Sequence, residues 1–203
     1  GAIDMARAIR SPGSTLKPLI YGLAFESGFA HPETLIEDRP TRFGSYRPKN
    51  FDDTFHGTLT IREALQKSLN IPAVKVLSVV SPTRLLARLR DSGVHFELPT
   101  DAAPSLAVAL GGVGMSLVDL TTLYAEIARG GDSVKLHYQL FDATAAAAEE
   151  TTRLLDPIAN WYVADVLSGV APPKNGKHRA IAYKTGTSYG FRDAWAAGFD
   201  GRT

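Results

Sequence analysis

The chain has 203 residues, a formal net charge of +1 at pH 7 and no cysteine. This length suits one domain with its own core, and the near-neutral charge gives no electrostatic reason to expect a nucleic-acid partner. The absence of cysteine excludes disulfides, thiol catalysis and cysteine metal ligands, and no apolar run approaches the length of a membrane span.

The first stretch that could hold catalytic residues is Arg10–Pro18. In it Ser14 and Lys17 stand three residues apart at the predicted start of a helix. Residues at this spacing share a helix face. A lysine amine that is shielded from water can become neutral and accept the proton of a serine hydroxyl. Apolar residues at helical spacing follow, and Gly28 ends the run. Because two residues at this spacing also arise by chance, Ser14 and Lys17 are candidates that need further support.

A change of composition follows, and residues 31–57, rich in proline and glycine, are predicted to be irregular. Thr60 and Glu63 then form a capping box that opens a helix, which is predicted to end near residues 68–70. Pro72 suits the first turn of a second helix that runs from Ala73 to Val80. Ser68 and Asn70 therefore lie on a short connection from which polar side chains can enter a cleft, although Ser-x-Asn alone is more typical of a turn or cap.

Neither a metal site nor a cofactor site is predicted. The histidines are scattered and form no ligand pair at helical spacing, and the glycine-rich residues 111–114 lack the spacing of a dinucleotide loop. Further helices are predicted at 117–129, capped by Ser116 and Asp119, and at 158–167, opened by Asp156 and Pro157.

The end of the chain changes to the alternation of strands, at 180–185 and 193–199, with a turn at 188–191. Lys184 offers a positive charge, while Thr185 and Thr187 offer hydroxyl groups. Gly186 removes a side chain where a ligand could lie against the strand edge. A peptide with a free carboxylate, laid antiparallel along this edge, would find backbone hydrogen bonds and an anion site. The alternative is an ordinary hairpin with a glycine near its turn.

Together, Ser-x-x-Lys, Ser-x-Asn and Lys-Thr-Gly form a much more specific pattern than any one of them. This triplet occurs in penicillin-binding proteins and class A β-lactamases. The chain resembles the transpeptidase domain of class A penicillin-binding proteins, and residues 10–18, 64–72 and 183–195 look most like the 1C subgroup.

The resemblance implies an α/β (α+β) fold, with a mostly helical lobe against an antiparallel sheet and the site between them. From the resemblance we expect residues 1–203 to form a partial serine transpeptidase domain, without the family's strands before Arg10, its last strand and its C-terminal helix. We expect such a piece alone to be poorly stable or inactive, and its truncated sheet edges to associate. A glycosyltransferase domain and a membrane anchor would belong to the parent protein, at the periplasmic face of the bacterial inner membrane.

The implied activity is a serine acyltransferase that acts on peptidoglycan stem peptides ending in D-alanyl-D-alanine. Ser14 would attack the penultimate carbonyl, with Lys17 as its base. Ser68 and Lys184 would relay a proton to the leaving nitrogen, and Asn70 would hold both the substrate amide and Lys17. The amine of a neighbouring peptide then accepts the acyl group, or water does in carboxypeptidase action.

The resemblance also implies how the ligand is held. Thr185 and Thr187, on either side of Gly186, would meet the terminal carboxylate. The backbone N–H groups of Ser14 and Thr187 would form the oxyanion hole. β-Lactam antibiotics, as mimics of the substrate, would acylate Ser14.

Three alternatives stay open. A β-lactam-sensing module would keep Ser14 and Lys17 without turnover. A class A β-lactamase is less favoured, because no Glu-x-x-Leu-Asn sequence stands between Asn70 and Lys184, and Leu69 occupies the position where that family usually has aspartate. A structural domain with coincidental motifs would not be acylated.

Overall fold

The computed structural model describes residues 3–100, 102–136, 152–172 and 181–200. No helix in these ranges is long and apolar enough to cross a membrane. In chain order the helices, 3₁₀ turns (η) and strands are η1 (Gly13–Leu16), α1 (Lys17–Glu26), β1 (Leu35–Asp38), β2 (Gly57–Thr60), α2 (Ile61–Gln66), α3 (Asn70–Val80), α4 (Pro82–Asp91), η2 (Leu106–Leu110), α5 (Leu117–Ala128), α6 (Pro157–Ser168), β3 (Ala182–Thr187), η4 (Tyr189–Phe191) and β4 (Ala194–Phe199).

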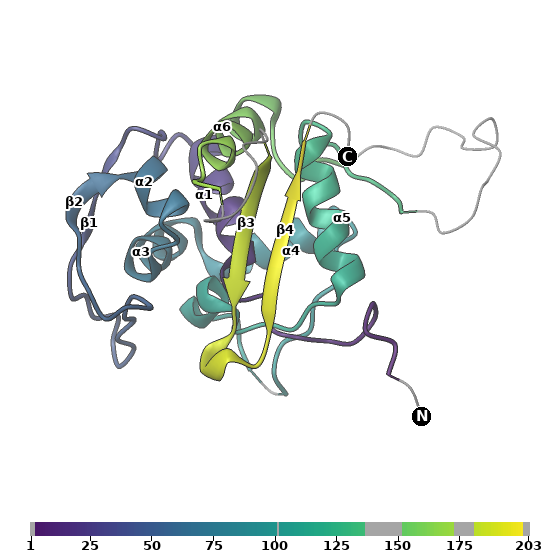
Figure 1. Ribbon diagram of the computed structural model, residues 1–203, viewed down its shortest axis with the longest axis horizontal. Helices are drawn as coiled ribbons and strands as arrows, with labels where there is room; N and C mark the ends of the chain where they lie inside the picture. The colour runs from purple at the N-terminus through teal and green to yellow at the C-terminus, as the bar shows by residue number, and fades with distance from the viewer. Residues whose placement is uncertain (1–2, 101, 137–151, 173–180, 201–203) are drawn as a thin grey trace.

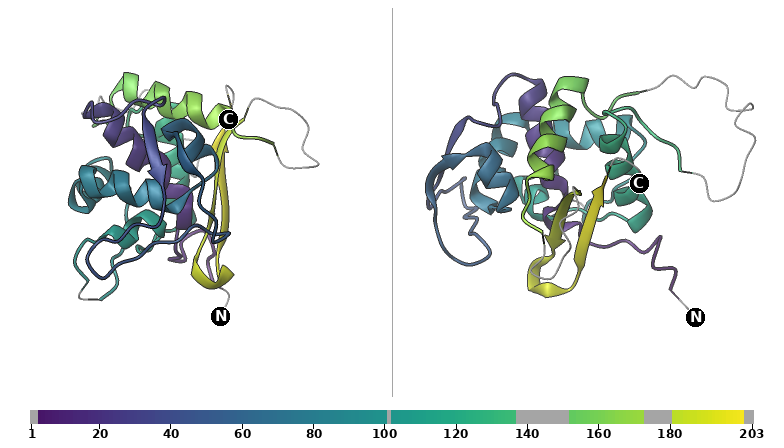
Figure 2. Two further views of the ribbon diagram at one scale, coloured as in Figure 1. Left: turned by 90° about the vertical axis from the view of Figure 1, so that its left-hand side faces the viewer. Right: turned by 45° about the horizontal axis from the view of Figure 1, so that its top comes forward.

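The helices form one layer, and the antiparallel hairpin of β3 and β4 lies along one side of it (Figures 1 and 2). Helix α1 runs through the interior, where it contacts α3 and α6. All of its residues from Lys17 to Phe25 are buried, as is typical of a helix that is apolar on every side. The predicted fold class, a helical lobe against an antiparallel sheet, is confirmed.

The segment at 31–57 is more regular than its composition predicts. Strand β1 pairs antiparallel with β2, with Leu35 opposite Thr60 and Asp38 opposite Gly57. The prediction of irregular structure is therefore wrong for residues 35–38 and for Gly57. Four residues are too few to show a reliable alternation, and the partner strand lies about 20 positions further along the chain.

Local signals for helix starts are confirmed. Thr60 and Glu63 form a capping box on α2, and Ser116 and Asp119 form one on α5. Helix α3 begins at Asn70, earlier than the predicted Ala73, so that Pro72 lies in its first turn. Ser68 occupies the bend before it with a φ of 60°, a conformation that is strained for a residue other than glycine.

The terminal hairpin brings the Lys-Thr-Gly motif to the middle of a strand. Gly186 pairs with Trp195, and β3 extends to Thr187, beyond the predicted end at Thr185. The predicted start at Ala180 lies outside the described residues. Side chains alternate along β3, so that Lys184 is buried while Thr185 and Thr187 are exposed.

Candidate active site

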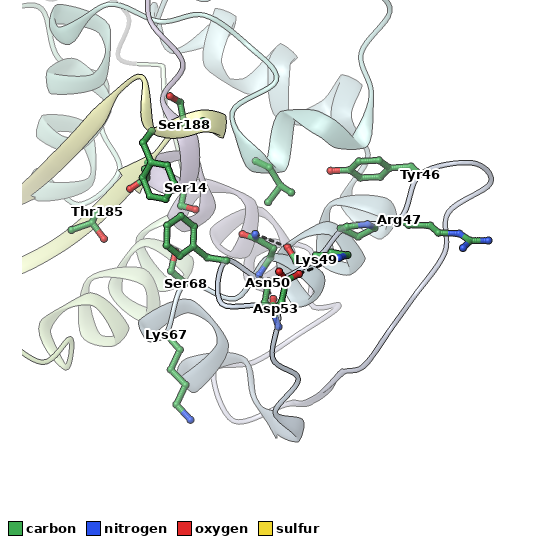
Figure 3. A pocket seen from close by; sticks show the side chains of 17 residues that line it. Ser14, Tyr46, Arg47, Lys49, Asn50, Asp53, Lys67, Ser68, Thr185 and Ser188 are labelled. Atoms are coloured by element: carbon green, nitrogen blue, oxygen red, sulfur yellow. Dashed lines mark hydrogen bonds and ion pairs between the residues drawn. The ribbon is translucent and has the colours of Figure 1, made fainter.

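A cleft of about 730 Å³ lies between the hairpin, the start of the α1 region, the α2–α3 connection and residues 46–53 (Figure 3). The structure brings predicted site residues from all three motifs to this cleft. They are Ser14, Ser68, Asn70, Thr185 and Thr187. The other predicted residues do not line it, and they are Lys17, Lys184 and Gly186.

Lys17 is completely buried beneath the cleft. Its Nζ donates to the backbone oxygens of Ser68 (2.7 Å) and Leu69 (3.1 Å) and to Oδ1 of Asn70 (2.7 Å). Burial, and then the positive charge of Lys184, hold the pKa of Lys17 well below 10.5. Three acceptors favour the charged amine, whereas burial favours the neutral one. The contact between Asn70 and Lys17 implied by the resemblance is present.

Ser14 lies on the 3₁₀ turn η1, directly before α1. It is half-buried, and within the described part of the chain its hydroxyl makes no hydrogen bond. A direct hydrogen bond to Lys17 is thus absent here, because Lys17 Nζ is engaged by its three acceptors. Catalytic hydrogen bonds are often long until a substrate binds, so a free hydroxyl facing the cleft suits a nucleophile.

Lys184 lies on the buried face of β3 and donates to the backbone oxygen of Thr185 at 2.8 Å. Burial lowers its pKa to about 8. Among the described residues, no hydrogen bond joins it to Ser68, so the implied relay between these two is not formed here. Its positive charge lowers the pKa of Lys17, in addition to the effect of burial.

Gly186 lies where β3 packs closely on η1. A Cβ on Gly186 would overlap the backbone oxygen of Pro12 and lie 3.0 Å from the amide nitrogen of Thr15. The position of a side chain on this residue is therefore taken by the protein's own chain. The assignment of Gly186 as a substrate contact stays a prediction, whereas the close packing of β3 on η1 is observed.

Gly13, on η1, also lies close to strand β3. Its φ is +54°, and a Cβ there would lie 2.7 Å from the backbone oxygen and 2.9 Å from the amide nitrogen of Thr187. Because neither glycine carries a side chain, the backbones of η1 and β3 approach closely. This approach places the residue before Ser14 beside the Thr187 amide.

Side chains that the sequence does not single out support this turn. Trp195 Nε1 donates to the backbone oxygen of Ser11 at 2.9 Å, and the Tyr124 hydroxyl donates to that of Thr15 at 3.0 Å. Ser11 Oγ donates to the backbone oxygen of Gly111 at 2.8 Å. Half-buried and buried aromatic residues with a polar tip commonly find such partners, but the sequence does not reveal which partner each one takes.

Two aromatic rings that line the cleft touch each other. Phe51 and Phe191 meet edge to face, with ring centroids 5.3 Å apart. The basic residues Arg47, Lys49 and Lys67 also line the cleft. Within the described residues, no cluster of His, Asp or Glu side chains has the size needed to hold a metal ion.

Comparisons with known proteins agree with this geometry. The family described as "Penicillin binding protein transpeptidase domain" matches residues 2–200. The chain is 44% identical, over its whole length, to penicillin-binding protein 1C of Escherichia coli K12. It is 31% identical, over 95% of its length, to penicillin-binding protein 1F of Bacillus subtilis 168. These alignments cover 26% and 29% of the relatives, so the chain spans about a quarter of their length.

Solved structures share the fold. PonA1 from Mycobacterium tuberculosis, in complex with penicillin V, matches 98% of this chain with a TM-score of 0.81 at 21% identity, and the match covers 60% of PonA1. Penicillin-binding protein 1A from Haemophilus influenzae matches 97% of this chain with a TM-score of 0.79 at 20% identity, and the match covers 37% of that protein. Since the family match covers nearly the whole sequence, the chain belongs to the penicillin-binding protein transpeptidase domain family.

Proposed function

We propose that the chain catalyses the acyl-transfer step of peptidoglycan cross-linking, through an acyl-enzyme on Ser14. The observation that carries this proposal is the convergence of the three motifs on one cleft, with the Ser14 hydroxyl free and the buried amine of Lys17 below it. The substrate class is a stem peptide that ends in D-alanyl-D-alanine, and β-lactams react at the same serine.

The first step forms an ester. Ser14 Oγ attacks the carbonyl carbon of the penultimate D-alanine, and its proton passes to the neutral amine of Lys17. Breaking the C–N bond releases the terminal D-alanine, whose nitrogen takes up a proton, with Ser68 and Lys184 as its relay. An acceptor amine then attacks the ester, forms the cross-link and restores Ser14; water at this step gives carboxypeptidase action.

The same geometry supports binding of the transition state. The Thr187 amide nitrogen lies beside the turn that carries Ser14, so the N–H groups of these two residues can stabilise the oxyanion. One such donor is worth roughly 3–4 kcal/mol in other acyl-transfer enzymes. Thr185 and Thr187 line the cleft and would bind the terminal carboxylate, with Gly186 between them.

The site of action follows from the substrate. Peptidoglycan lies outside the cytoplasmic membrane, so the proposed location is the extracytoplasmic, periplasmic face. Membrane attachment and glycosyltransferase activity would belong to other parts of a longer parent protein.

Labelling with a fluorescent penicillin tests this function. In the intact protein that carries this sequence, we expect a covalent adduct at Ser14 that persists for many minutes, and no adduct in Ser14→Ala. The matched control is Ser78→Ala, which removes an exposed serine of α3 that donates only to the backbone oxygen of Lys75. Labelling of Ser14→Ala at the wild-type level would overturn the assignment of the nucleophile.

The fate of the adduct separates the alternatives. Rapid hydrolysis would indicate a β-lactamase. A stable adduct in a protein that does not cross-link muropeptides would indicate a sensor. Cross-linking by the intact protein, lost in Ser14→Ala, is the result expected of a transpeptidase.

The pH dependence of acylation tests the electrostatics of Lys17. Acylation requires the neutral amine, so its rate should rise with pH on a limb well below the ordinary lysine pKa of 10.5. Lys184→Met removes a positive charge that disfavours the ammonium form of Lys17. The pKa of Lys17 then rises, and the limb should move to higher pH. Stopped-flow acylation between about pH 5 and 10, a range that lies below the ordinary lysine pKa, measures the limb, and a move to lower pH would contradict the argument.

A further inference from the structure

Asn50 is a buried residue whose side-chain hydrogen bonds join the segment 39–56 to the candidate site (Figure 3). Its Nδ2 lies 2.9 and 2.8 Å from the two carboxylate oxygens of Asp38 and 2.8 Å from the backbone oxygen of Thr54. Its Oδ1 accepts a hydrogen bond from the amide nitrogen of Asn70 at 2.8 Å. Every polar atom of this side chain is therefore used, and one of its partners is a candidate site residue.

Asn70 is in turn held so that its side chain can point only one way. Its Nδ2 donates to the backbone oxygen of Lys49 at 2.8 Å, while its Oδ1 accepts from Lys17 Nζ at 2.7 Å. A flipped amide would place two oxygens together at one end and two donors together at the other. The backbone oxygen of Lys49 thus sets the direction of the Asn70 side chain, while Asn50 holds the backbone nitrogen of the same residue.

Asp38 holds the Asn50 side chain in place by accepting hydrogen bonds from its Nδ2. It is completely buried, and its Oδ2 also accepts from the backbone nitrogen of His56 at 2.9 Å. His56 Nδ1 lies 3.1 Å from the same oxygen. A buried carboxylate is stable only when hydrogen bonds replace its water, so the pair of Asp38 and Asn50 resists displacement.

We propose that Asn50, anchored by Asp38, is a positioning residue for acylation: it orients Asn70 and through it the amine of Lys17. This inference rests on the proposed function. It assigns no contact between Asn50 and the reacting atoms. A purely structural role, in which Asn50 only closes the loop, would leave the chemistry of Lys17 unchanged in the molecules that fold.

The two roles differ in their pH dependence. Asn70 Oδ1 accepts a hydrogen bond that favours the ammonium form of Lys17. If Asn70 turns away, the ammonium loses this acceptor, the pKa of Lys17 falls further, and the ascending limb of acylation moves to lower pH. The charged group that acts on Lys17 is Lys184, and the titratable ring of His56 lies 3.1 Å from the Asp38 carboxylate. The measurement is therefore repeated in a His56→Gln background.

The experiment uses the intact protein and compares two variants. Asn50→Ala should lower the acylation rate constant by up to about 100-fold, the effect of a small misplacement of a reacting group, and move the limb to lower pH. The matched control is Asn160→Ala: Asn160 is equally buried and donates to the backbone oxygen of Ile127, so this variant should lose stability and keep the wild-type limb.

A second measurement does not depend on turnover. The ¹³Cε shift of Lys17, titrated by NMR in the wild type and in Asn50→Ala, reports the pKa of Lys17 directly. A lower pKa in Asn50→Ala supports the inference even if the wild type fails to label with penicillin, a result that would refute the proposed function alone. An unchanged pKa and limb in Asn50→Ala, with activity reduced only in proportion to the folded fraction, would overturn the inference.

Discussion

Replacing Lys17 with methionine is expected to slow the acylation of Ser14 by roughly 10²–10⁴-fold, the usual contribution of a general base. Methionine fills a similar unbranched volume but cannot accept the serine proton. The residual rate would come from the oxyanion donors and from binding of the ligand. The measurement is the second-order rate constant for a fluorescent penicillin at a pH above the wild-type limb.

Lys75→Met provides a matched control. Lys75 is half-buried on α3 and, like Lys17, donates from Nζ to a backbone oxygen, that of Glu37 at 2.7 Å. It lines no part of the cleft. This variant should lose a comparable hydrogen bond and keep its acylation rate. If Lys17→Met were acylated as fast as Lys75→Met, another group would have to serve as the base.

Replacing Gly13 with alanine is expected to slow acylation by roughly 10²–10³-fold, the cost of losing one oxyanion donor. The new Cβ would lie 2.7 Å from the backbone oxygen of Thr187, so β3 must move away from the turn that carries Ser14. The Thr187 amide would then leave its place beside the turn. We also expect a loss of about 1–3 kcal/mol in the free energy of unfolding, from overpacking and from the positive φ.

Gly28→Ala separates the effect of backbone strain from the effect of the clash with β3. Gly28 has a φ of +70°, but a Cβ there would meet nothing within 4 Å. This variant carries the same kind of backbone strain as Gly13→Ala without the clash. Urea unfolding should show destabilisation in both variants, whereas acylation should be slowed only in Gly13→Ala. Equal acylation by the two variants would mean that the close approach of β3 is not needed for the reaction.

Much of the local structure follows from the sequence, because the groups that determine it are neighbours in the chain. The capping boxes on α2 and α5 join residues three positions apart, and the hairpin of β3 and β4 joins alternating segments across a short turn. The three motifs occur in a fixed order, and this order was enough to indicate the family and to name the candidate residues.

Only the tertiary structure reveals what these residues contact. Lys17 has a lowered pKa because the fold buries it completely and also brings Lys184, far away in the sequence, near it. Gly186 lies against Pro12. Asn50 meets Asp38 and Asn70, which are 12 and 20 positions away.

The sequence by itself therefore determined the capped starts of α2 and α5, the terminal hairpin and the candidate residues of the three motifs. The tertiary structure decided the burial and the hydrogen-bond partners of the Lys17 amine, the closeness of η1 and β3 and the part played by residues 49 and 50. The physical reason is range: caps and turns depend on groups a few positions apart, whereas desolvation, Coulomb interactions and close packing depend on whatever the fold brings near.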